Sequence, residues 1–579
     1  MKYPYLSELP VTREMISAFG GYNHNLRIGD GEFYDMKNLI SDDYPVLSPR
    51  RARGVYVDSG TPQGMIAKDA LCYVDGGDFV INEYRVPMGL TVDDEPKTLV
   101  SMGAYVIILP DKMYINTSDL TDYGKIEAGV DSASTVTFEL CTVDGSVYED
   151  VFVQASAPEE PENMDYWIDT SSVPNALKQY SSTSATWVSI ATTYIKIRAT
   201  GIGKPFSQYD AVTISGVESE SLADLNGTMV IWAKGDDYIV VIGILDKATT
   251  QEAAITISRT MPNMDFVIES ENRLWGCRYG TDINGNVVNE LYASKLGDFK
   301  NWNSFLGLST DSYAVTLGTD GQFTGAITHL GLPLFFKENY IHAVYGDYPS
   351  NFRIQTTACR GVQKGCSRSL AIVNETLIYK SRSAVCGYDG SLPVELSAAL
   401  GGVAYHSAVA GTVGNKYYIS MADDDEVYHL FVYDTKKGMW HREDNTHVTE
   451  FCTCRGDLYY TDAADGKIKT VLGTGTAEES PIEWMAETGV IGTDSPDKKY
   501  ISRLDVRMSL SLDTRVFFFI QYDSSGEWEH IFTMNGIKLQ SFSVPIRPRR
   551  CDHLRLRIEG VGNAKIYSIC KTIEQGSDI

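Results

Sequence analysis

The sequence has no long apolar run, and this absence excludes a common class of protein. No window approaches the roughly 18 consecutive apolar residues that a membrane-spanning helix needs, so we expect no membrane insertion. The first residues, Met1 to Met15, lack both a basic head and an apolar core, so we expect no secretory signal. Long amphipathic helical patterns are also essentially missing. We therefore expect a folded protein built mainly from strands and made in a cytoplasm.

Close cysteine pairs and the common catalytic motifs are missing as well. None of the 10 cysteines forms a CxxC pair, and only Cys452 and Cys454 are close in sequence, so we expect buried free thiols. The sequence contains no GxxxxGK[ST] loop, GxSxG elbow, HExxH helix or GxGxxG fingerprint. These absences predict no cofactor, no metal site and no catalytic residues. We therefore predict that the chain is not an enzyme.

Two acidic segments come nearest to a metal site. Asp282 to Asn286 begin like a calcium loop, but Val287 stands where the turn glycine belongs and Ala293 where the bidentate glutamate belongs. We interpret this segment as a hairpin turn. The four carboxylates from Asp423 to Glu426 are interpreted as a solvated loop tip.

Positive charge is scarce and unevenly distributed. The formal net charge is −26, and residues 119 to 261 alone hold 8 basic and 21 acidic side chains. Residues 501 to 571 reverse the balance, with 11 basic and 7 acidic side chains. An acidic body disfavours affinity for nucleic acid, because phosphate binding needs a cationic surface. An acidic channel lining would let DNA slide past, although the simpler interpretation of the acidity is solubility.

A recurring unit is the strongest signal in the sequence. In each copy a short apolar run leads through a polar turn into an apolar and aromatic run, as from Ala371 through Asn374 to Tyr379. Five equivalent positions are separated by 60, 43, 40 and 41 residues; they are Leu274, Leu334, Leu377, Tyr417 and Leu458. A repeat of roughly 40–50 residues with alternating strands is typical of β-propeller blades.

The repeat predicts an all-β chain organised around a β-propeller of about six or seven blades. The blades are expected at residues 54–124 and 261–473, interrupted by an inserted small acidic β domain at 125–260. An N-terminal arm at 1–53 precedes them, and a C-terminal β-sandwich at 482–575 follows a linker. A stacked array of sandwiches is the alternative architecture.

Several short segments occur in an order that is characteristic of one protein family. Near the N-terminus they are Phe19-Gly20-Gly21-Tyr22-Asn23, Asp30-Gly31-Glu32, Asp35-Met36-Lys37-Asn38-Leu39, Tyr44-Pro45 and Arg50-Arg51-Ala52-Arg53. Further on they include Leu274-Trp275-Gly276, Phe299-Lys300-Asn301-Trp302, Leu334-Phe335-Phe336-Lys337-Glu338 and Tyr388-Asp389-Gly390-Ser391. In this order the chain resembles the tail nozzle and tail stabilisation (hub) proteins of short-tailed bacteriophages over most of its length.

The resemblance implies a structural virion protein of a phage tail or neck. It implies a propeller-based subunit that assembles with itself into a ring, a hexamer, around the DNA exit channel and docks other tail, adaptor or portal proteins. DNA would pass through without specific binding, and the protein would occupy the host cytoplasm during assembly. No functional residues transfer. The alternatives are a carbohydrate-binding or glycan-cleaving propeller at a tail tip and a kelch-like interaction scaffold.

The basic C-terminal region predicts an interface. Arg547, Arg549 and Arg550 follow one predicted strand, and Arg555 and Arg557 alternate on one face of the next. Alternate arginines on a strand can form bidentate pairs with carboxylates. We predict that these five residues contact an acidic neighbouring subunit or another tail protein. A solvated basic face is the alternative.

Overall fold

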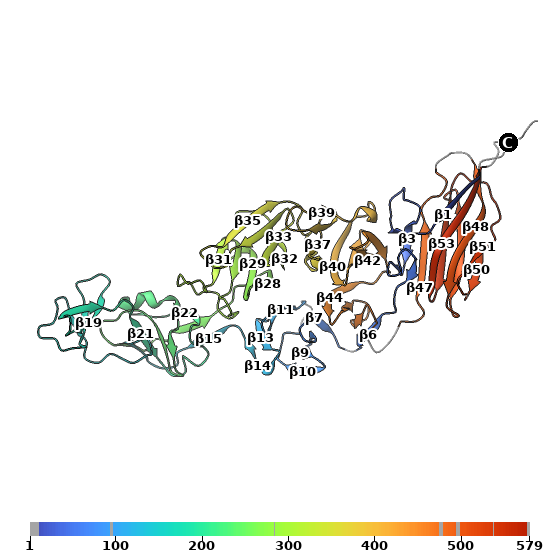
Figure 1. The fold of residues 1–579 in the computed structure, drawn as a ribbon. Coiled ribbons are helices and arrows are strands. Elements are labelled where there is room, and N and C mark those ends of the chain that lie inside the picture. The colour runs from blue at the N-terminus through green and yellow to red at the C-terminus, as the bar shows by residue number, and fades with distance from the viewer. Residues whose placement is uncertain are drawn as a thin grey trace, which may run out of the picture.

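The chain folds into three bodies in a row, as Figure 1 shows. The computed structural model describes residues 11–575, except 59, 93–95, 283, 474–478, 494–497 and 537. Residues 1–10 of the expected N-terminal arm and 474–478 of the expected linker lie outside the described residues. Strands dominate, and the helices of the described part are short 3-10 turns. None of its helices is long and apolar enough to cross a membrane. The all-β prediction is confirmed.

The central body is a closed β-propeller. Its described residues form seven four-stranded antiparallel blades. Blades one to three are β7 (Pro62–Ala67), β8 (Leu71–Asp75), β9 (Asp78–Ile81) and β10 (Tyr84–Pro87); β11 (Thr98–Met102), β12 (Tyr105–Leu109), β13 (Met113–Asn116) and β14 (Asp119–Lys125); and β28 (Phe266–Ser270), β29 (Arg273–Thr281), β30 (Val287–Ala293) and β31 (Tyr313–Thr316). The propeller prediction is therefore confirmed.

The remaining blades complete the circle, and the last one uses a strand from the start of the chain. Blades four to six are β32 (Phe323–His329), β33 (Leu332–Lys337), β34 (Tyr340–Tyr345) and β35 (Arg353–Ala358); β36 (Ala371–Val373), β37 (Thr376–Lys380), β38 (Val385–Tyr388) and β39 (Val394–Glu395); and β40 (Tyr405–Val413), β41 (Lys416–Asp423), β42 (Tyr428–Asp434) and β43 (Met439–Arg442). Blade seven is β44 (Val448–Cys454), β45 (Asp457–Asp462), β46 (Ile468–Thr470) and β6 (Gly54–Val57). Because β6 pairs with β46, the two ends of the propeller are held together by backbone hydrogen bonds.

Blades adhere to each other because their inner strands are apolar on both faces. On β8, Val74 packs in a cluster with Val106 of blade two, whereas its neighbour Tyr73 packs with Tyr459 of blade seven. Successive side chains of a strand point to opposite faces, so one apolar run serves two blade interfaces. This explains why these strands read as continuous apolar segments and not as alternating ones.

Residues 128–259 form a separate unit, here called the insertion, which projects from between blades two and three. Its body has two sheets, β15-β27-β22-β23 and β24-β25-β21-β16-β26, packed around their own apolar core. The strands are β15 (Ala128–Asp131), β16 (Val136–Cys141), β21 (Tyr194–Arg198), β22 (Ala211–Ser215), β23 (Gly227–Val230), β24 (Ala233–Lys234), β25 (Tyr238–Ile242), β26 (Thr249–Gln251) and β27 (Thr256–Arg259), with η1 (Glu220–Leu225) between β22 and β23. A smaller sheet, the tip sheet, follows the order β17 (Phe152–Gln154), β18 (Tyr166–Asp169), β19 (Ala176–Ser181) and β20 (Thr186–Ser189).

The third body is a β-sandwich at the C-terminal end. Its outer sheet has the order β1 (Val11–Ile16), β53 (Ala564–Gln575), β48 (Lys499–Leu510) and β51 (Gln540–Val544). Its inner sheet contains β47 (Glu483–Thr488), β52 (Leu554–Val561), β49 (Arg515–Tyr522) and β50 (Glu529–Asn535). Two short N-terminal strands, β4 (Leu39–Ile40) and β5 (Ser48–Pro49), pair with each other nearby.

The N-terminal residues expected as an arm are instead built into the other bodies. β1 pairs with β53 over its whole length. β2 (Gly21–Tyr22) pairs with β43 of blade six and with β3 (Glu32–Lys37), which pairs with β47 of the sandwich. The physical reason is that β43 and β47 each have a free edge, and the N-terminal strands satisfy the backbone groups of both.

Candidate functional site: the axial cavity of the propeller

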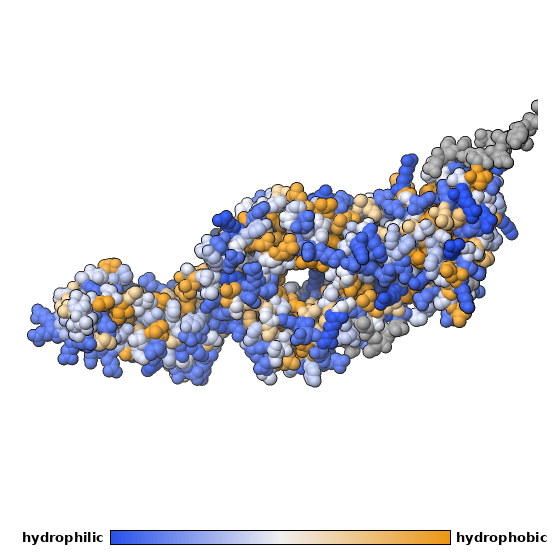
Figure 2. All heavy atoms as spheres, viewed as in Figure 1, coloured by the Kyte–Doolittle hydropathy of each residue, from blue (hydrophilic) through white to orange (hydrophobic). Residues whose placement is uncertain are grey.

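A cavity of about 700 Å³ lies at the centre of the propeller. Figure 2 shows an opening in the middle of the ring. The wall is formed by first strands of blades and the segments next to them, from β7, β11, β28, β32 and β44, with η2 (Ser367–Ser369) beside them. The first strand of each blade lies nearest the axis, so closure of the ring brings together residues that are up to 385 positions apart, from Met65 to Glu450.

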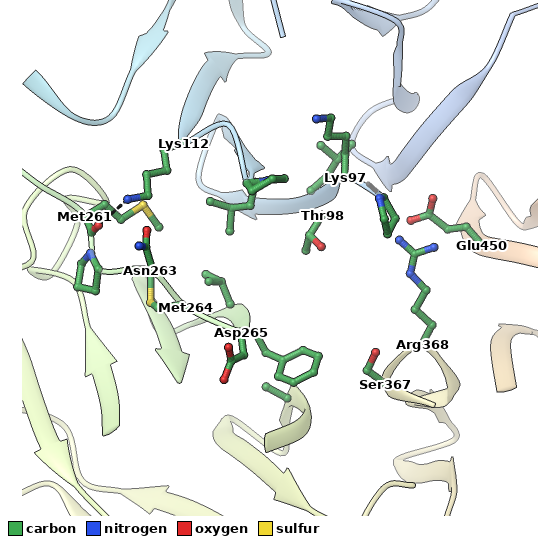
Figure 3. Close-up of a pocket in the computed structure, with 18 of the residues that line it drawn as sticks. Lys97, Thr98, Lys112, Met261, Asn263, Met264, Asp265, Ser367, Arg368 and Glu450 are labelled. Carbon is green, nitrogen blue, oxygen red and sulfur yellow. Dashed lines mark hydrogen bonds between the residues drawn. The ribbon is translucent and has the colours of Figure 1, made fainter. Parts of the chain in front are cut away.

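One side of the axial cavity carries a carboxylate from blade seven and a guanidinium from the 3-10 turn η2, which lies between blades four and five. Glu450 of β44 and Arg368 of η2 point toward each other in Figure 3. The Glu450 carboxylate accepts hydrogen bonds from the backbone N–H groups of Gly64 and Met65. Burial raises the pKa of Glu450, and Arg368 and these two donors only partly oppose the rise. Arg368 is itself held by a 2.8 Å hydrogen bond from Nη1 to the carbonyl oxygen of Thr449.

A second carboxylate lies in the same cavity. Asp265 precedes β28, where its N–H donates to the carbonyl oxygen of Cys277 at 2.7 Å and its Oδ2 accepts from the N–H of Tyr279 at 2.8 Å. These bonds fix Asp265 to the neighbouring strand β29. Desolvation by the surrounding protein raises the pKa of Asp265, against weaker opposing effects of the Tyr279 N–H and of Arg278.

The lysines of the cavity wall are already paired with acidic groups. Lys97 is buried and lies 3.0 Å from Asp111. Lys112 contacts Glu127 at 2.7 Å and donates to the carbonyl oxygen of Met261 at 2.8 Å. The polar groups that face the open space therefore include two carboxylates with raised pKa values, one guanidinium and the side chain of Asn263, set among Met, Pro, Leu and Phe residues.

This arrangement is chemically suited to a neutral polar ligand. A carboxyl group with a raised pKa is nearer to the protonated form at neutral pH, so it can donate or accept a hydrogen bond or a proton. Hydroxyl-rich molecules bind such groups when apolar side chains cover their CH faces. Glycoside hydrolysis, in turn, requires two carboxyl groups that flank the glycosidic bond to be cleaved.

The segments weighed as metal sites form turns in the structure. The Asp282 carboxylate accepts hydrogen bonds from the backbone N–H groups of Asn284 and Asn286, whereas Ile283 lies outside the described residues. The Asp423 carboxylate accepts from the N–H groups of Asp425 and Val427 and contacts His429 at 2.8 Å. In the described part of the chain no group of three or more His, Cys, Asp and Glu residues could hold a metal ion. All ten cysteines are free thiols.

The arginines predicted as an interface lie on the sandwich, away from the axial cavity. Arg555 and Arg557 both contact Glu487 of their own chain, at 3.1 and 2.7 Å. Arg549 lies 2.7 Å from Glu529 at the surface. Arg547 and Arg550 are exposed. Because they alternate on one strand face, Arg555 and Arg557 contact the same carboxylate, that of Glu487, which belongs to the same chain.

The residues of the axial cavity were not singled out from the sequence. Asp265 and Glu450 were not recognisable among 76 acidic residues, because each is one carboxylate in a separate blade repeat. The available signal was positional, since both lie in or next to the first strand of a blade.

Comparisons with known proteins yield similar folds only. No family model matches the sequence, and no curated protein matches it. The similar solved structures include an exo-β-1,3-galactanase from Phanerochaete chrysosporium with galactose, at 9% identity, a TM-score of 0.21, and coverage of 53% of this chain and 94% of that chain. They also include an engineered GH43 glycoside hydrolase with endo-xylanase and exo-arabinofuranosidase activity, at 8% identity, a TM-score of 0.20, and coverage of 54% and 96%. A Trypanosoma rangeli sialidase mutant with trans-sialidase activity is similar at 8% identity, a TM-score of 0.19, and coverage of 97% and 96%.

One prediction from the sequence is corrected by these comparisons. The chain was predicted not to be an enzyme, and that prediction is contradicted because the similar structures include glycoside hydrolases. We do not retain it. At such identities and TM-scores the likeness concerns the fold, and no catalytic residue is transferred from these enzymes to this chain.

Proposed function

We propose that the chain is a structural subunit of a bacteriophage tail or neck. In this proposal it assembles into a hexameric ring around the DNA exit channel and docks other tail, adaptor or portal proteins. It resides in the virion and, during assembly, in the host cytoplasm. DNA passes the acidic surface without specific binding. The order of short segments shared with tail nozzle and hub proteins supports this proposal.

The observation that carries the proposal is the separation of charge along an elongated chain. The acidic insertion and the basic sandwich lie at opposite ends of the molecule, with the propeller between them (Figure 1). Unlike charges on opposite ends favour association of copies end to end and steer their encounter. A contact of this kind joins unlike surfaces, so it closes into a ring when the rotation between copies allows it.

The experiment is the native mass of the purified full chain. We expect a species several times the 64.1 kDa monomer, and ring-shaped particles by electron microscopy. The species should dissociate as salt is raised, because exposed charges are screened. A chain that stays monomeric at its highest soluble concentration would overturn the proposal.

A second candidate function is the binding or cleavage of a glycan in the axial cavity. The observation that favours it is the presence of Asp265 and Glu450, both with raised pKa values, in one cavity of about 700 Å³. Several of the similar structures are glycoside hydrolases, so the comparisons support this candidate more than the ring. A propeller can serve both roles, because the cavity is internal to one chain.

This candidate is tested with a glycan array and with release of reducing sugar from polysaccharides. We expect Asp265→Asn and Glu450→Gln to abolish the signal of the wild-type chain. Asp389→Asn is the control, because Asp389 lies in an exposed turn of blade five. Absence of binding and cleavage in the wild type, or an unchanged signal in both cavity variants, would rule the candidate out.

A further inference from the structure

Among the described residues, the outer sheet of the sandwich presents an exposed face that is both apolar and basic. We call it the basic face, and its residues are Val11, Arg13, Met15, Arg503, Asp505 and Arg507. Val11 is 59% exposed and Met15 is 68% exposed. These side chains project from β1 and from the alternate positions of β48 that point away from the sandwich core. All of them except Val11 line a surface groove of about 490 Å³, which Phe542 also lines.

The basic face has more positive charge than its own chain neutralises. Arg13 and Arg503 share one carboxylate, that of Asp505, at 3.5 and 2.8 Å. Arg507 donates from Nε to the hydroxyl of Ser541 at 2.9 Å. The basic face therefore carries three guanidinium groups and one carboxylate, and that carboxylate pairs with two of them. The side chains of Arg13 and Arg503 are 63% and 59% exposed, so their remaining N–H groups are accessible to a partner.

The far end of the insertion has the opposite character. We call it the acidic tip, and its residues are Phe152, Val153, Met164, Glu149, Asp150, Glu159, Glu160 and Glu162. The three apolar side chains are about half exposed, and all five carboxylates are exposed. Residues 149 to 165 contain six acidic residues and no lysine or arginine. Within the described part of the chain, these five carboxylates make no ion pair.

The two surfaces match in chemistry and differ in position. Each has exposed apolar side chains beside an excess of charge, positive on one and negative on the other, which is the composition of a specific protein interface. They lie at opposite ends of the molecule, so they meet only between copies (Figure 1). A second copy of this chain therefore supplies the complementary partner for each surface.

We propose that the acidic tip of one copy docks on the basic face of a second copy. The inference rests on the ring proposed above and names the contact that builds it. The apolar residues of the tip would cover Val11 and Met15, and its glutamates would take the free N–H groups of Arg13, Arg503 and Arg507. Contact between two unlike patches repeats from copy to copy, so it generates a ring or, without closure, a filament.

The test is charge reversal on each surface and then on both. The variant Arg503→Glu/Arg507→Glu and the variant Glu159→Lys/Glu160→Lys should each weaken self-association by about tenfold or more. The combination of all four substitutions should recover most of the wild-type association, because it restores opposite charges across the contact. Arg515→Glu and Glu220→Lys are matched controls on exposed residues outside the two surfaces and should leave association unchanged. Native mass and sedimentation are the readouts.

A second measurement avoids any dependence on charge variants. A photo-crosslinking residue at Val173, which is 99% exposed next to the tip sheet, should give an intermolecular product that maps by mass spectrometry to β1 or β48. Monomeric wild-type protein would overturn the ring itself. Oligomers that are unaffected by both reversals, or that crosslink elsewhere, would leave the ring standing and overturn this contact.

Discussion

The propeller carries two attached bodies, and the two attachments are built differently. On the C-terminal side, β2 and β3 extend the sheet of blade six into the inner sheet of the sandwich, so ten strands form one continuous sheet. One apolar core runs through this joint and includes Trp440 of β43 and Trp484 of β47. The insertion shares no sheet with the propeller in the described part of the chain, and its apolar core is separate.

Both joints nevertheless contain a buried cluster of arginine and carboxylate. At the sandwich joint, Arg53 lies 2.6 Å from Glu443 and 2.9 Å from Asp444, and Arg50 lies 2.7 Å from Glu479. Burial alone would raise the pKa of Asp444, but Arg53, Thr446 and Arg50 lower it to about 2. Glu479 belongs to the segment that leads into the sandwich, so this cluster links three parts of the chain.

At the insertion joint the cluster is smaller. Arg259 pairs with Asp210 and donates from Nη2 to the carbonyl oxygen of Ile126 at 3.0 Å. Asn301 of the propeller donates to Asp210 at 3.1 Å and accepts from the N–H of Ala211 at 2.7 Å. The two joints therefore differ in kind. A continuous apolar core couples the sandwich to the propeller, whereas the insertion has its own core and is oriented on the propeller by hydrogen bonds.

The largest expected effect is at the sandwich joint. Arg53→Ala should lower the free energy of unfolding by about 3–5 kcal/mol, because it leaves the buried carboxylate of Glu443 without its closest cation. Denaturant unfolding should show the propeller and sandwich destabilised together. Separate unfolding transitions for the propeller and the sandwich would contradict the conclusion that one core couples these two bodies.

The second effect is a dependence on pH from buried histidines, which the propeller has and the insertion lacks. Burial lowers the pKa of His441, on β43, to about 3, so the folded state keeps it neutral while the unfolded state binds a proton below about 6.5. Stability from this group is full above about pH 6.5 and falls as the pH drops toward 3, by up to a few kcal/mol.

Thermal unfolding across this pH range checks the prediction. His441→Leu should flatten the curve in part, because His342 of blade four, whose pKa burial lowers to about 4, titrates in the same window. The insertion has no histidine, so its own transition should not fall between about pH 6.5 and 5, where no carboxylate contributes. If stability in the His441→Leu variant fell with pH as steeply as in the wild type, His441 would not be a source of the pH dependence.

A smaller effect is expected at the insertion joint. Asn301→Ala removes hydrogen bonds to Asp210 and to the backbone of Ala211, and should cost about 1–3 kcal/mol of local stability. Limited proteolysis should cut the joint faster, while the unfolding of the propeller stays close to wild type. Global destabilisation instead would mean that the insertion is coupled as tightly as the sandwich.

The smallest effect comes from an exposed ion pair beside the sandwich joint. Lys37 and Glu483 lie 3.3 Å apart, and their side chains are 42% and 71% exposed. Lys37→Ala should change the free energy of unfolding by less than about 1 kcal/mol, because solvent screens the pair. It serves as the control for Arg53→Ala. A loss as large as that of Arg53→Ala would show that burial does not set the strength of these contacts.

The local parts of the fold could be predicted from the sequence because they depend on short-range patterns. Asn374 and Glu375 join β36 to β37 with positive φ angles of 47° and 68°, the backbone of a tight hairpin between two apolar runs. The same unit recurs around the ring, so its period indicated blades. Pairing of β1 with β53 or β6 with β46 leaves no such signal, because the partners are hundreds of residues apart and any strand edge can accept them.

The sequence by itself determined that the chain is an all-β repeat protein with an acidic insertion and a basic C-terminal region. Periodicity, turn residues and charge counts are properties of the chain alone. Only the tertiary structure decided that Asp265 and Glu450 share one cavity and that Arg555 and Arg557 pair within their own chain. The physical reason is that ring closure and strand pairing set these distances, and both depend on contacts between residues far apart in sequence.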